Sequence, residues 1–191
     1  MSTSLCDIAL KYHCDKHPEI GHGYTPYYSE LLHGRNIKRI LEIGIGGIAC
    51  MGYIPDYVVG ASLFMWQDYF PEAEIVGWDI DPDALINVDH IKSLLCDQGR
   101  IESLHEAAAL SGGKFDLIID DGSHRPEHQA LTANVIIPLL LKEEGLYVIE
   151  DMLHPEWVSP LLLYPHEIKE TGNIHLTLDD RLIVIRGNKK A

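Results

Sequence analysis

The sequence has no long apolar run. Its longest one lies near residues 135–141, far short of the roughly 18 residues that a membrane-spanning helix needs. The first residues also lack the basic and apolar regions of a secretory signal peptide. We therefore expect a protein without a membrane partner that works in the cytoplasm.

Cysteine is scarce and widely spaced. The four cysteines are Cys6, Cys14, Cys50 and Cys96, and no two of them form a Cys-x-x-Cys pair. Disulfide frameworks and cysteine-based zinc sites need closer and more regular spacings. The pattern predicts reduced thiols in an intracellular protein.

Basic side chains are few compared with acidic ones. Fifteen Lys and Arg residues stand against 29 Asp and Glu residues, which gives a formal net charge of -14. Such a surface repels phosphate backbones, so we do not expect a nucleic-acid partner. A length of 191 residues with 46% hydrophobic residues is enough for one domain with a real core.

Residues 39–47 combine a short apolar run with a glycine-rich turn. The run predicts a strand that is buried on both faces. Gly44, Gly46 and Gly47 would let the backbone turn sharply and approach a ligand closely. Glu42 lies inside the apolar run, where an acid is costly unless it is paired or functional. A strand, a glycine turn and a following helix are typical of a nucleotide-type site, although these residues alone fit an ordinary α/β turn equally well.

The rest of the chain alternates between helical and strand patterns. The sequence predicts helices over 4–12, with Ser4 as N-cap, 26–33, with Thr25 as N-cap, 61–70, 100–110 and 126–141. It predicts strands over 40–45, 74–81, 91–97, 115–121 and 146–151, and a hairpin of 174–178 with 182–185. Segments 48–60 and 153–165 are the candidate lids.

This alternation predicts an α/β fold. We expect a Rossmann-like, doubly wound, mostly parallel sheet that ends in an antiparallel hairpin. The whole chain, 1–191, would form one domain. Within it, residues 1–36 would be a helical cover and residues 37–191 the core.

Acidic residues stand at the ends of four predicted strands. One or two of them could simply favour the N-terminus of the next helix, but four fit better with a polar ligand and a cation. Asp79 and Asp81 are placed to accept hydrogen bonds from ribose hydroxyls, and alternation along the strand favours only one of them. Asp97 is placed for an adenine amino group. A carboxylate beside the ribose suits a free 2′-hydroxyl, and therefore a nucleoside of the S-adenosylmethionine (SAM) or NAD type.

Three more acids are expected to converge. If the fourth and fifth strands are neighbours, Asp121 lies roughly 5 Å from Glu150 and Asp151. Carboxylates without thiolates select Mg²⁺, Mn²⁺ or Ca²⁺. His124 would lie beside this cation, where we favour a role as base over that of a surface residue or helix cap.

With these residues assembled, the chain resembles the metal-dependent sugar O-methyltransferases of the macrocin and mycinamicin type, whose relatives often carry the label cephalosporin hydroxylase. These are class I SAM-dependent methyltransferases. The matching segments lie between residue 12 and about residue 157: Tyr12-x-x-Asp-Lys16, 24–30, 40–47, 60–66, 68–71, 79–81, 120–124, 128–129 and 145–151. The Asp-Asp-Gly-Ser-His segment at 120–124 and the Tyr-Val-Ile-Glu-Asp segment at 147–151 are the most specific of them.

The resemblance implies a SAM- and Mg²⁺-dependent O-methyltransferase. The metal ligands would be Asp121, Glu150 and Asp151, and His124 would be the general base. The cofactor-binding residues would be Lys16, Tyr24, Thr25, Glu42, Gly44, Gly46, Gly47, Ser62, Asp79, Asp81, Asp97, Gln98 and Asp120. The acceptor would be a hydroxyl of a vicinal diol in a small sugar, glycoside or catechol-like molecule, whose metal-activated alkoxide attacks the sulfonium methyl.

The chain also departs from this family. We expect its 191 residues to be close to a minimal catalytic domain, whereas the macrolide enzymes also carry a large N-terminal domain, and Ile48 stands where a third glycine is usual. Alternatives are an NAD-dependent oxidoreductase, whose glycine pattern tolerates Ala49, and a non-catalytic module that binds SAM or a metal. A homodimer or higher homo-oligomer could complete the substrate pocket.

Overall fold

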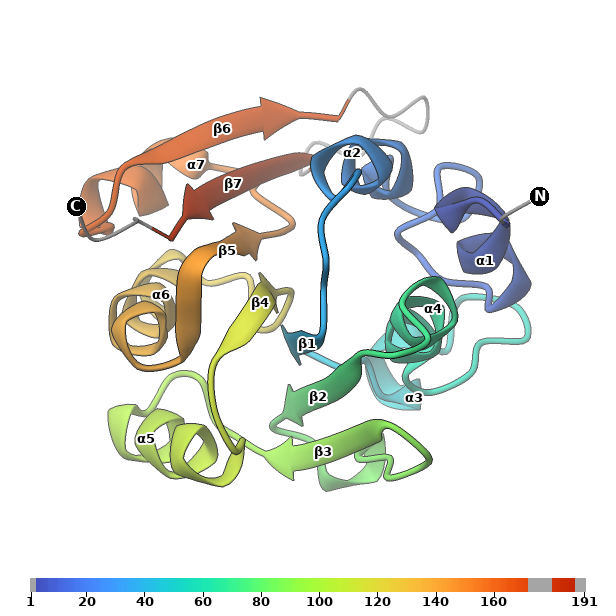
Figure 1. Ribbon diagram of the computed structural model, residues 1–191, viewed down its shortest axis with the longest axis horizontal. Coiled ribbons are helices and arrows are strands. Elements are labelled where there is room, and N and C mark those ends of the chain that lie inside the picture. Colours follow the sequence, from blue (N-terminus) through green and yellow to red (C-terminus); the bar gives the residue numbers. More distant parts are fainter. Residues whose placement is uncertain (1–2, 172–179, 188–191) are drawn as a thin grey trace.

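A central sheet between two layers of helices dominates the computed structural model, which describes residues 3–171 and 180–187 (Figure 1). Among these residues the sheet has seven strands in the order β3-β2-β1-β4-β5-β7-β6. The strands are β1 (Arg39–Ile43), β2 (Glu74–Asp79), β3 (Ile91–Leu95), β4 (Phe115–Asp120), β5 (Leu141–Ile149), β6 (His166–Glu170) and β7 (Arg181–Arg186). β1 to β5 pair in parallel, whereas β7 is antiparallel to both of its neighbours. The predicted doubly wound, mostly parallel fold is confirmed.

The helices divide between the two faces of the sheet. α1 (Leu5–Lys11), α2 (Tyr24–Leu31) and α4 (Ala61–Tyr69) cover one face. α5 (Ile101–Leu110), α6 (Pro126–Leu140) and α7 (Pro155–Val158) cover the other. The short helix α3 (Ile48–Met51) and the 3₁₀ turns η1 (Pro82–Ala84) and η2 (Ser159–Leu161) lie in connections. In the described part of the chain, no helix is both long and apolar enough to cross a bilayer.

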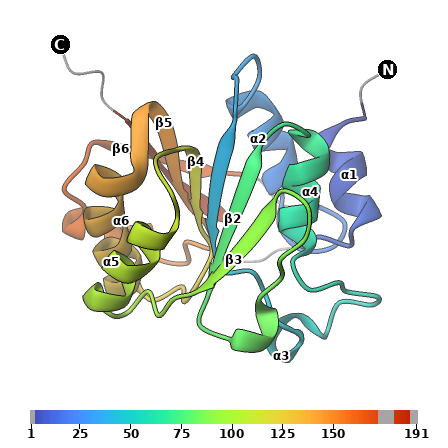
Figure 2. The ribbon, with the colours of Figure 1, turned by 60° about the horizontal axis from the view of Figure 1, so that its bottom comes forward.

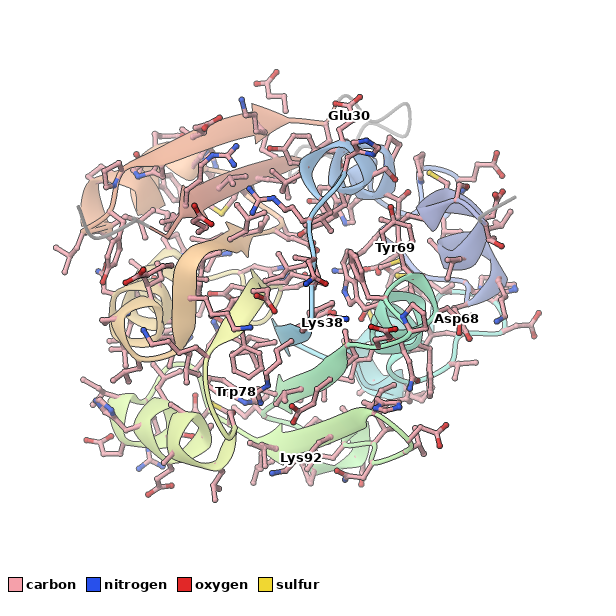
Figure 3. All side chains as sticks on the ribbon, in the orientation of Figure 1. Glu30, Lys38, Asp68, Tyr69, Trp78 and Lys92 are labelled. Atoms are coloured by element: carbon pink, nitrogen blue, oxygen red, sulfur yellow. The ribbon has the colours of Figure 1, made fainter. Side chains whose placement is uncertain are left out.

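Alternation along the strands sorts the apolar side chains into two cores. Ile40 packs with the layer of α1, α2 and α4, and Leu41 with the layer of α5 and α6. Trp78 of β2 is fully buried toward α5, and its indole Nε1 donates to Ser111 Oγ at 3.1 Å (Figure 3). Lys92 on the edge strand β3 points to solvent. Burial on both faces explains why the inner strands read as continuous apolar runs.

The first two helices show how well local signals predict helix starts. Ser4 caps α1 as expected, in a reciprocal capping box with Asp7. The prediction for α2 was wrong, because the helix begins at Tyr24 with Gly23 as its N-cap. The Gly23 N–H donates to Asp180 Oδ1 at 3.0 Å, and the Thr25 N–H donates to the Lys16 carbonyl, so distant residues fix this start.

The C-terminal strands differ from the sequence prediction. β7 pairs with β5 on one side and with β6 on the other. β6 lies in the segment 153–171, to which the sequence analysis assigned no helix or strand, while residues 174–178 lie outside the described residues. β5 also begins earlier than predicted, at Leu141, because this residue pairs with Phe115. The next pair is Leu117 with Leu146, so the register shifts between these two pairs.

The carboxyl ends of the parallel strands meet at one edge of the sheet. Asp120 pairs with Ile149, and the Glu150 N–H donates to the Asp120 carbonyl at 2.9 Å, so the residues after β4 and β5 are neighbours as predicted. The segment that carries α3 extends beyond the ends of β1, β2 and β3 (Figure 2). This end of the sheet holds the candidate site.

Candidate functional site

A cavity of about 570 Å³ lies at the carboxyl ends of β1 to β4. The glycine turn after β1 forms its inner wall. Gly44 has φ of +93°, and a Cβ there would lie 2.0 Å from the Asp121 carbonyl oxygen. Only glycine permits this close crossing of the two strand ends. The turn therefore brings the end of β1 against the residues that follow β4.

Asp79 holds the turn in place. Its Oδ2 accepts hydrogen bonds from the Ile45 N–H at 2.7 Å and the Gly46 N–H at 3.2 Å, and its Oδ1 accepts from the Asp81 N–H at 2.8 Å. On the other side of the turn, the Tyr57 hydroxyl donates to the Gly46 carbonyl at 2.9 Å. These contacts fix the loop 48–60 over the cavity, to which it contributes lining residues. Residues 153–165 contribute none.

Asp121, His124 and Asp151 meet on the cavity wall. One potential ligand atom from each lies within 4.8 Å of the other two. His124 Nε2 is 3.3 Å from Asp121 Oδ1 and 3.4 Å from Asp151 Oδ2. The Tyr24 hydroxyl donates to Asp151 Oδ1 at 2.6 Å and so fixes that carboxylate.

Two of these residues have an uncommon backbone conformation. His124 has φ of +52° and Asp151 has φ of +54°, in the left-handed region that side chains other than glycine seldom adopt. Such strain persists where the surrounding structure imposes it, and it is concentrated at functional sites. Here it turns both side chains toward the cavity.

Behind this wall lies a buried charge cluster, which we define as Lys16, Glu42, Glu150 and Asp121. Lys16 Nζ is 2.6 Å from Asp121 Oδ2 and 3.3 Å from Glu42 Oε1, and it also contacts Glu150 Oε2. Its side chain is only 1% exposed. One ammonium group thus faces three carboxyl groups. Burial raises the pKa of Glu42 and of Glu150. Burial also opposes ionisation of Asp121, but the charge of Lys16 and the hydrogen bond from His124 outweigh it and lower the Asp121 pKa.

Aromatic donors complete the cluster. The Trp66 Nε1 donates to Glu42 Oε2 at 2.8 Å, and the Tyr28 hydroxyl donates to Glu150 Oε1. The two rings contact each other edge to face. Glu42 therefore meets the requirement that a buried acid be paired.

The electrostatics follow from burial and charge. Burial disfavours the imidazolium of His124, but the hydrogen bond to Asp121 and the fields of Asp121 and Asp151 outweigh it and raise the His124 pKa to about 9. Burial raises the pKa of Asp151 to about 6. Burial also opposes the charge of Lys16, yet the carboxylates around it raise its pKa well above the usual value, so it stays protonated.

The predicted site residues divide into two layers. Those that line the cavity are Gly44, Gly46, Gly47, Ser62, Asp79, Asp81, Asp97, Gln98, Asp121, His124 and Asp151. Those that lie behind it are Lys16, Tyr24, Thr25, Glu42, Asp120 and Glu150, which are absent from the lining and fully or almost fully buried. The second group supports the first through hydrogen bonds and ion pairs.

Thr25 and Gln98 differ in their relation to the cavity. Thr25 Oγ1 accepts a hydrogen bond from the Cys6 thiol at 3.2 Å and lies away from the cavity. Gln98 Nε2 donates to Asp120 Oδ1 at 2.9 Å, and Gln98 Oε1 accepts from the Ser123 N–H at 2.6 Å. The amide of Gln98 thus braces the loop that carries His124.

Sequence reasoning did not assign several other lining residues to the site. They are Asp15, His22, Met51, Tyr53, Tyr57, Ser123 and His128. His22 Nε2 lies 3.5 Å from Asp151 Oδ1. Asp15, Ser123 and His128 fall in segments that carry the family resemblance, whereas nothing in the local sequence marked His22, Met51, Tyr53 or Tyr57.

The chain is similar in sequence to curated O-methyltransferases, although no protein-family model matches it. It is 34% identical over 157 residues to mycinamicin VI 2''-O-methyltransferase of Micromonospora griseorubida, a match that covers 80% of this chain and 37% of that enzyme. It is 37% identical over 140 residues to demethylmacrocin O-methyltransferase of Streptomyces fradiae, covering 71% of this chain and 33% of that enzyme. The chain thus matches about a third of the length of these relatives.

The fold resembles a solved methyltransferase structure. That structure is the MycE methyltransferase of the mycinamycin biosynthetic pathway, in complex with Mg, SAH and mycinamycin VI. The TM-score is 0.72 at 25% sequence identity, and the match covers 98% of this chain and 55% of that one. These similarities agree with the resemblance found in the sequence.

Proposed function

Since this chain belongs to the family of the mycinamicin and macrocin sugar O-methyltransferases and has the class I methyltransferase fold, we propose that it transfers the methyl group of SAM to a hydroxyl group with the help of Mg²⁺. One observation carries the proposal: Asp121, His124 and Asp151 converge on the wall of the cavity that begins at the glycine turn. A donor site and an acid-base site then share one space.

The cavity suits a nucleoside cofactor. Its volume of about 570 Å³ lies within the ordinary range for small-molecule sites. Asp79 and Asp81 line it beside the turn, and Asp97 lines it at the end of β3. This order supports a ribose next to β2 and a base next to β3, as expected at the carboxyl ends of an open α/β sheet.

The donor set also suits a hard divalent cation. Asp121 and Asp151 offer carboxylate oxygens within 4.8 Å of each other on the wall of the cavity. Glu150, the third ligand predicted from the sequence, points to Lys16 and Tyr28 instead. When bound, a cation such as Mg²⁺ supplies Lewis-acid chemistry that lowers the pKa of a chelated hydroxyl.

The protein side chains would then have separate roles. Asp121 holds the His124 imidazole through Nε2 and keeps it at the cavity wall. The carboxylates of Asp121 and Asp151 raise the His124 pKa to about 9, and a cation held by these two acids would offset that effect. The neutral imidazole of His124 would then accept the proton of the acceptor hydroxyl, whose oxygen attacks the sulfonium methyl group in line. Tyr24 keeps Asp151 from turning away. Holding donor and acceptor in line would supply much of the rate acceleration.

We propose a small vicinal diol as the acceptor, in a sugar, glycoside or catechol-like molecule. Two adjacent hydroxyls can chelate one cation, which is the simplest use of an acceptor-side metal site. The relatives are a mycinamicin VI and a demethylmacrocin O-methyltransferase, but this chain matches only about a third of their length. The loop 48–60 is the described segment that could enclose the acceptor, because Met51, Tyr53 and Tyr57 line the cavity.

No observation favours the oxidoreductase alternative. Tyr12 and Lys16 have the Tyr-x-x-x-Lys spacing of some hydride-transfer enzymes, but they point to different places. The Tyr12 hydroxyl donates to Asp68 at the surface, at 2.9 Å, whereas Lys16 lies in the buried charge cluster. The two side chains do not form a common site.

The remaining expectations are proposals too. We propose that residues 1–36 cover a core of residues 37–191 in one domain, because Tyr24 and Tyr28 of α2 bond the acids after β5. A cytoplasmic location agrees with four free cysteines. A homo-oligomer agrees with the exposed Trp157 and Leu163, and sedimentation at two protein concentrations would test it.

Calorimetric titration with S-adenosylhomocysteine (SAH) tests the cofactor. We expect SAH to bind both with Mg²⁺ and with EDTA, because the cavity wall that holds the nucleoside is separate from the metal ligands. No binding in either buffer would exclude the methyltransferase, and NAD would be titrated next.

Replacing Asp121 with Asn tests the metal site. The variant removes one negative charge from the wall while keeping the shape of the side chain. We expect methyl transfer to a catechol or sugar diol to fall by about 100-fold or more, since metal activation and positioning of the base are lost together. SAH affinity should change little. Asp68→Asn at the surface is the matched control, and unchanged turnover in Asp121→Asn would refute the metal assignment.

A further inference from the structure

The end of the cavity next to β3 holds a second polar group, apart from the metal ligands. It consists of Asp97 and His128, which lie next to Gly99, and of Ser123, which contacts His128. We propose that His128 recognises the adenine ring of the cofactor by donating a hydrogen bond from Nε2 to a ring nitrogen. Asp97 would accept a hydrogen bond from the neighbouring amino group of the adenine. The inference rests on the proposed function and adds a specificity-determining residue to it.

Ser123 contacts the imidazole of His128. Ser123 Oγ lies 3.0 Å from His128 Nδ1, and it also accepts a hydrogen bond from the Arg125 N–H at 3.5 Å. In the proposed arrangement the Ser123 hydroxyl donates its proton to Nδ1, and the ring proton is then on Nε2. Gln98 holds Ser123 in turn, by accepting from its N–H. Within the described residues, His128 Nε2 has no hydrogen-bond partner.

Gly99 makes room for the ring. A Cβ at this position would lie 2.7 Å from His128 Cε1 and 2.8 Å from Nε2. The φ of Gly99 is not in the left-handed region, so the backbone does not require glycine there. What requires it is the close approach of the imidazole edge. The same Cβ would lie 3.2 Å from Asp97 Oδ1, which places the acid beside the ring.

Asp97 and His128 together form an acceptor next to a donor. Asp97 Oδ1 accepts from the Gly99 N–H at 2.9 Å, and the carboxylate keeps further lone pairs for a ligand. The amino edge of adenine has the matching pattern, an N–H donor beside a ring-nitrogen acceptor. Hypoxanthine has the reverse pattern, a carbonyl oxygen beside a ring N–H. The pair would therefore accept adenosine and reject inosine.

The test compares two ligands by calorimetry: SAH and its deaminated analogue, S-inosylhomocysteine. We expect the native chain to bind SAH at least about tenfold more tightly than the analogue, because the reversed pattern leaves polar groups unpaired. His128→Ala should weaken SAH binding roughly threefold to tenfold, the loss of one hydrogen bond, and leave the analogue within about twofold. His128→Gln, which keeps an N–H near the position of Nε2, should retain part of the preference. His105→Ala, an exposed histidine on α5, is the control.

Two further variants separate ring position from simple loss of structure. Gly99→Ala should push the imidazole away and lower the preference for SAH in the native background. In His128→Ala it should have a smaller effect, because only the contact of the new Cβ with Asp97 Oδ1 remains. Ser123→Ala should lower the preference in part, because it frees the tautomer. The proposal is refuted if His128→Ala and Gly99→Ala keep the native ratio of the two affinities. If the native chain binds neither ligand, the cofactor assignment itself fails, and with it this inference.

Discussion

Lys16 is the single ammonium group of the buried charge cluster, and replacing it with Met tests how the cluster stabilises the fold. The ion pair with Asp121 has a length of 2.6 Å, which corresponds to about 6 kcal/mol of attraction at an effective dielectric constant of about 20. Desolvation of both charges offsets part of this. Leaving buried carboxylates without their cation costs about 3–5 kcal/mol net. For a chain of this size, that lowers the melting temperature by roughly 6–20 °C.

The assay is urea denaturation in EDTA, followed by circular dichroism. The chain contains a matched control in the ion pair of Lys11 with Asp68, whose length is also 2.6 Å but which lies at the surface. Lys11→Met should leave the denaturation midpoint almost unchanged, because water screens the exposed charges. Adding Glu150→Gln to Lys16→Met should recover part of the loss. Equal shifts for Lys16→Met and Lys11→Met would refute the argument from burial.

Two more variants test the parts around the cluster. Gly44→Ala should lower both stability and SAH affinity, because a Cβ would lie 2.0 Å from the Asp121 carbonyl at a φ of +93°; thermal melts and calorimetry measure the two effects, and native values for both would contradict the role of the crossing. Tyr28→Phe removes the donor to the buried Glu150 and should cost about 1.5–3 kcal/mol in urea denaturation. Tyr27→Phe, a half-buried neighbour on the same helix, should cost less, and equal losses would refute the importance of that hydrogen bond.

The sheet could be predicted from the sequence because the inner strands have a clear hydrophobic pattern. β1, β2, β4 and β5 each read as apolar runs that end in glycine or acids, and parallel order followed from their alternation with helices. β6 was missed because its segment, His-Glu-Ile-Lys-Glu, is mostly exposed and polar. An edge strand of this kind depends on pairing with its neighbour, which local sequence does not show.

Only those site residues that directly follow a strand could be placed from the sequence. Asp121 and Asp151 follow neighbouring strands, so their proximity could be deduced from topology. Lys16 could not be placed in this way. It comes from a loop between two helices, 105 residues before Asp121 in the chain, and it reaches the cluster only through the packing of that loop. The same holds for Ser123 and His128, whose contact depends on how the loop before α6 folds.

The pairing of β4 with β5 has a consequence for how this chain can vary. Glu150 and Asp151 are adjacent, yet one points to the buried ammonium group and the other to the cavity. Inserting or deleting a single residue near the end of β5 would shift both acids by one position, so that one of the two places would lose its carboxylate and the other would hold the wrong acid. Length variation among natural homologues should therefore be tolerated after α7 but absent between β5 and Asp151. Because Glu150 and Asp151 point to different places, the number of residues at the end of β5 is more strictly constrained than their identity.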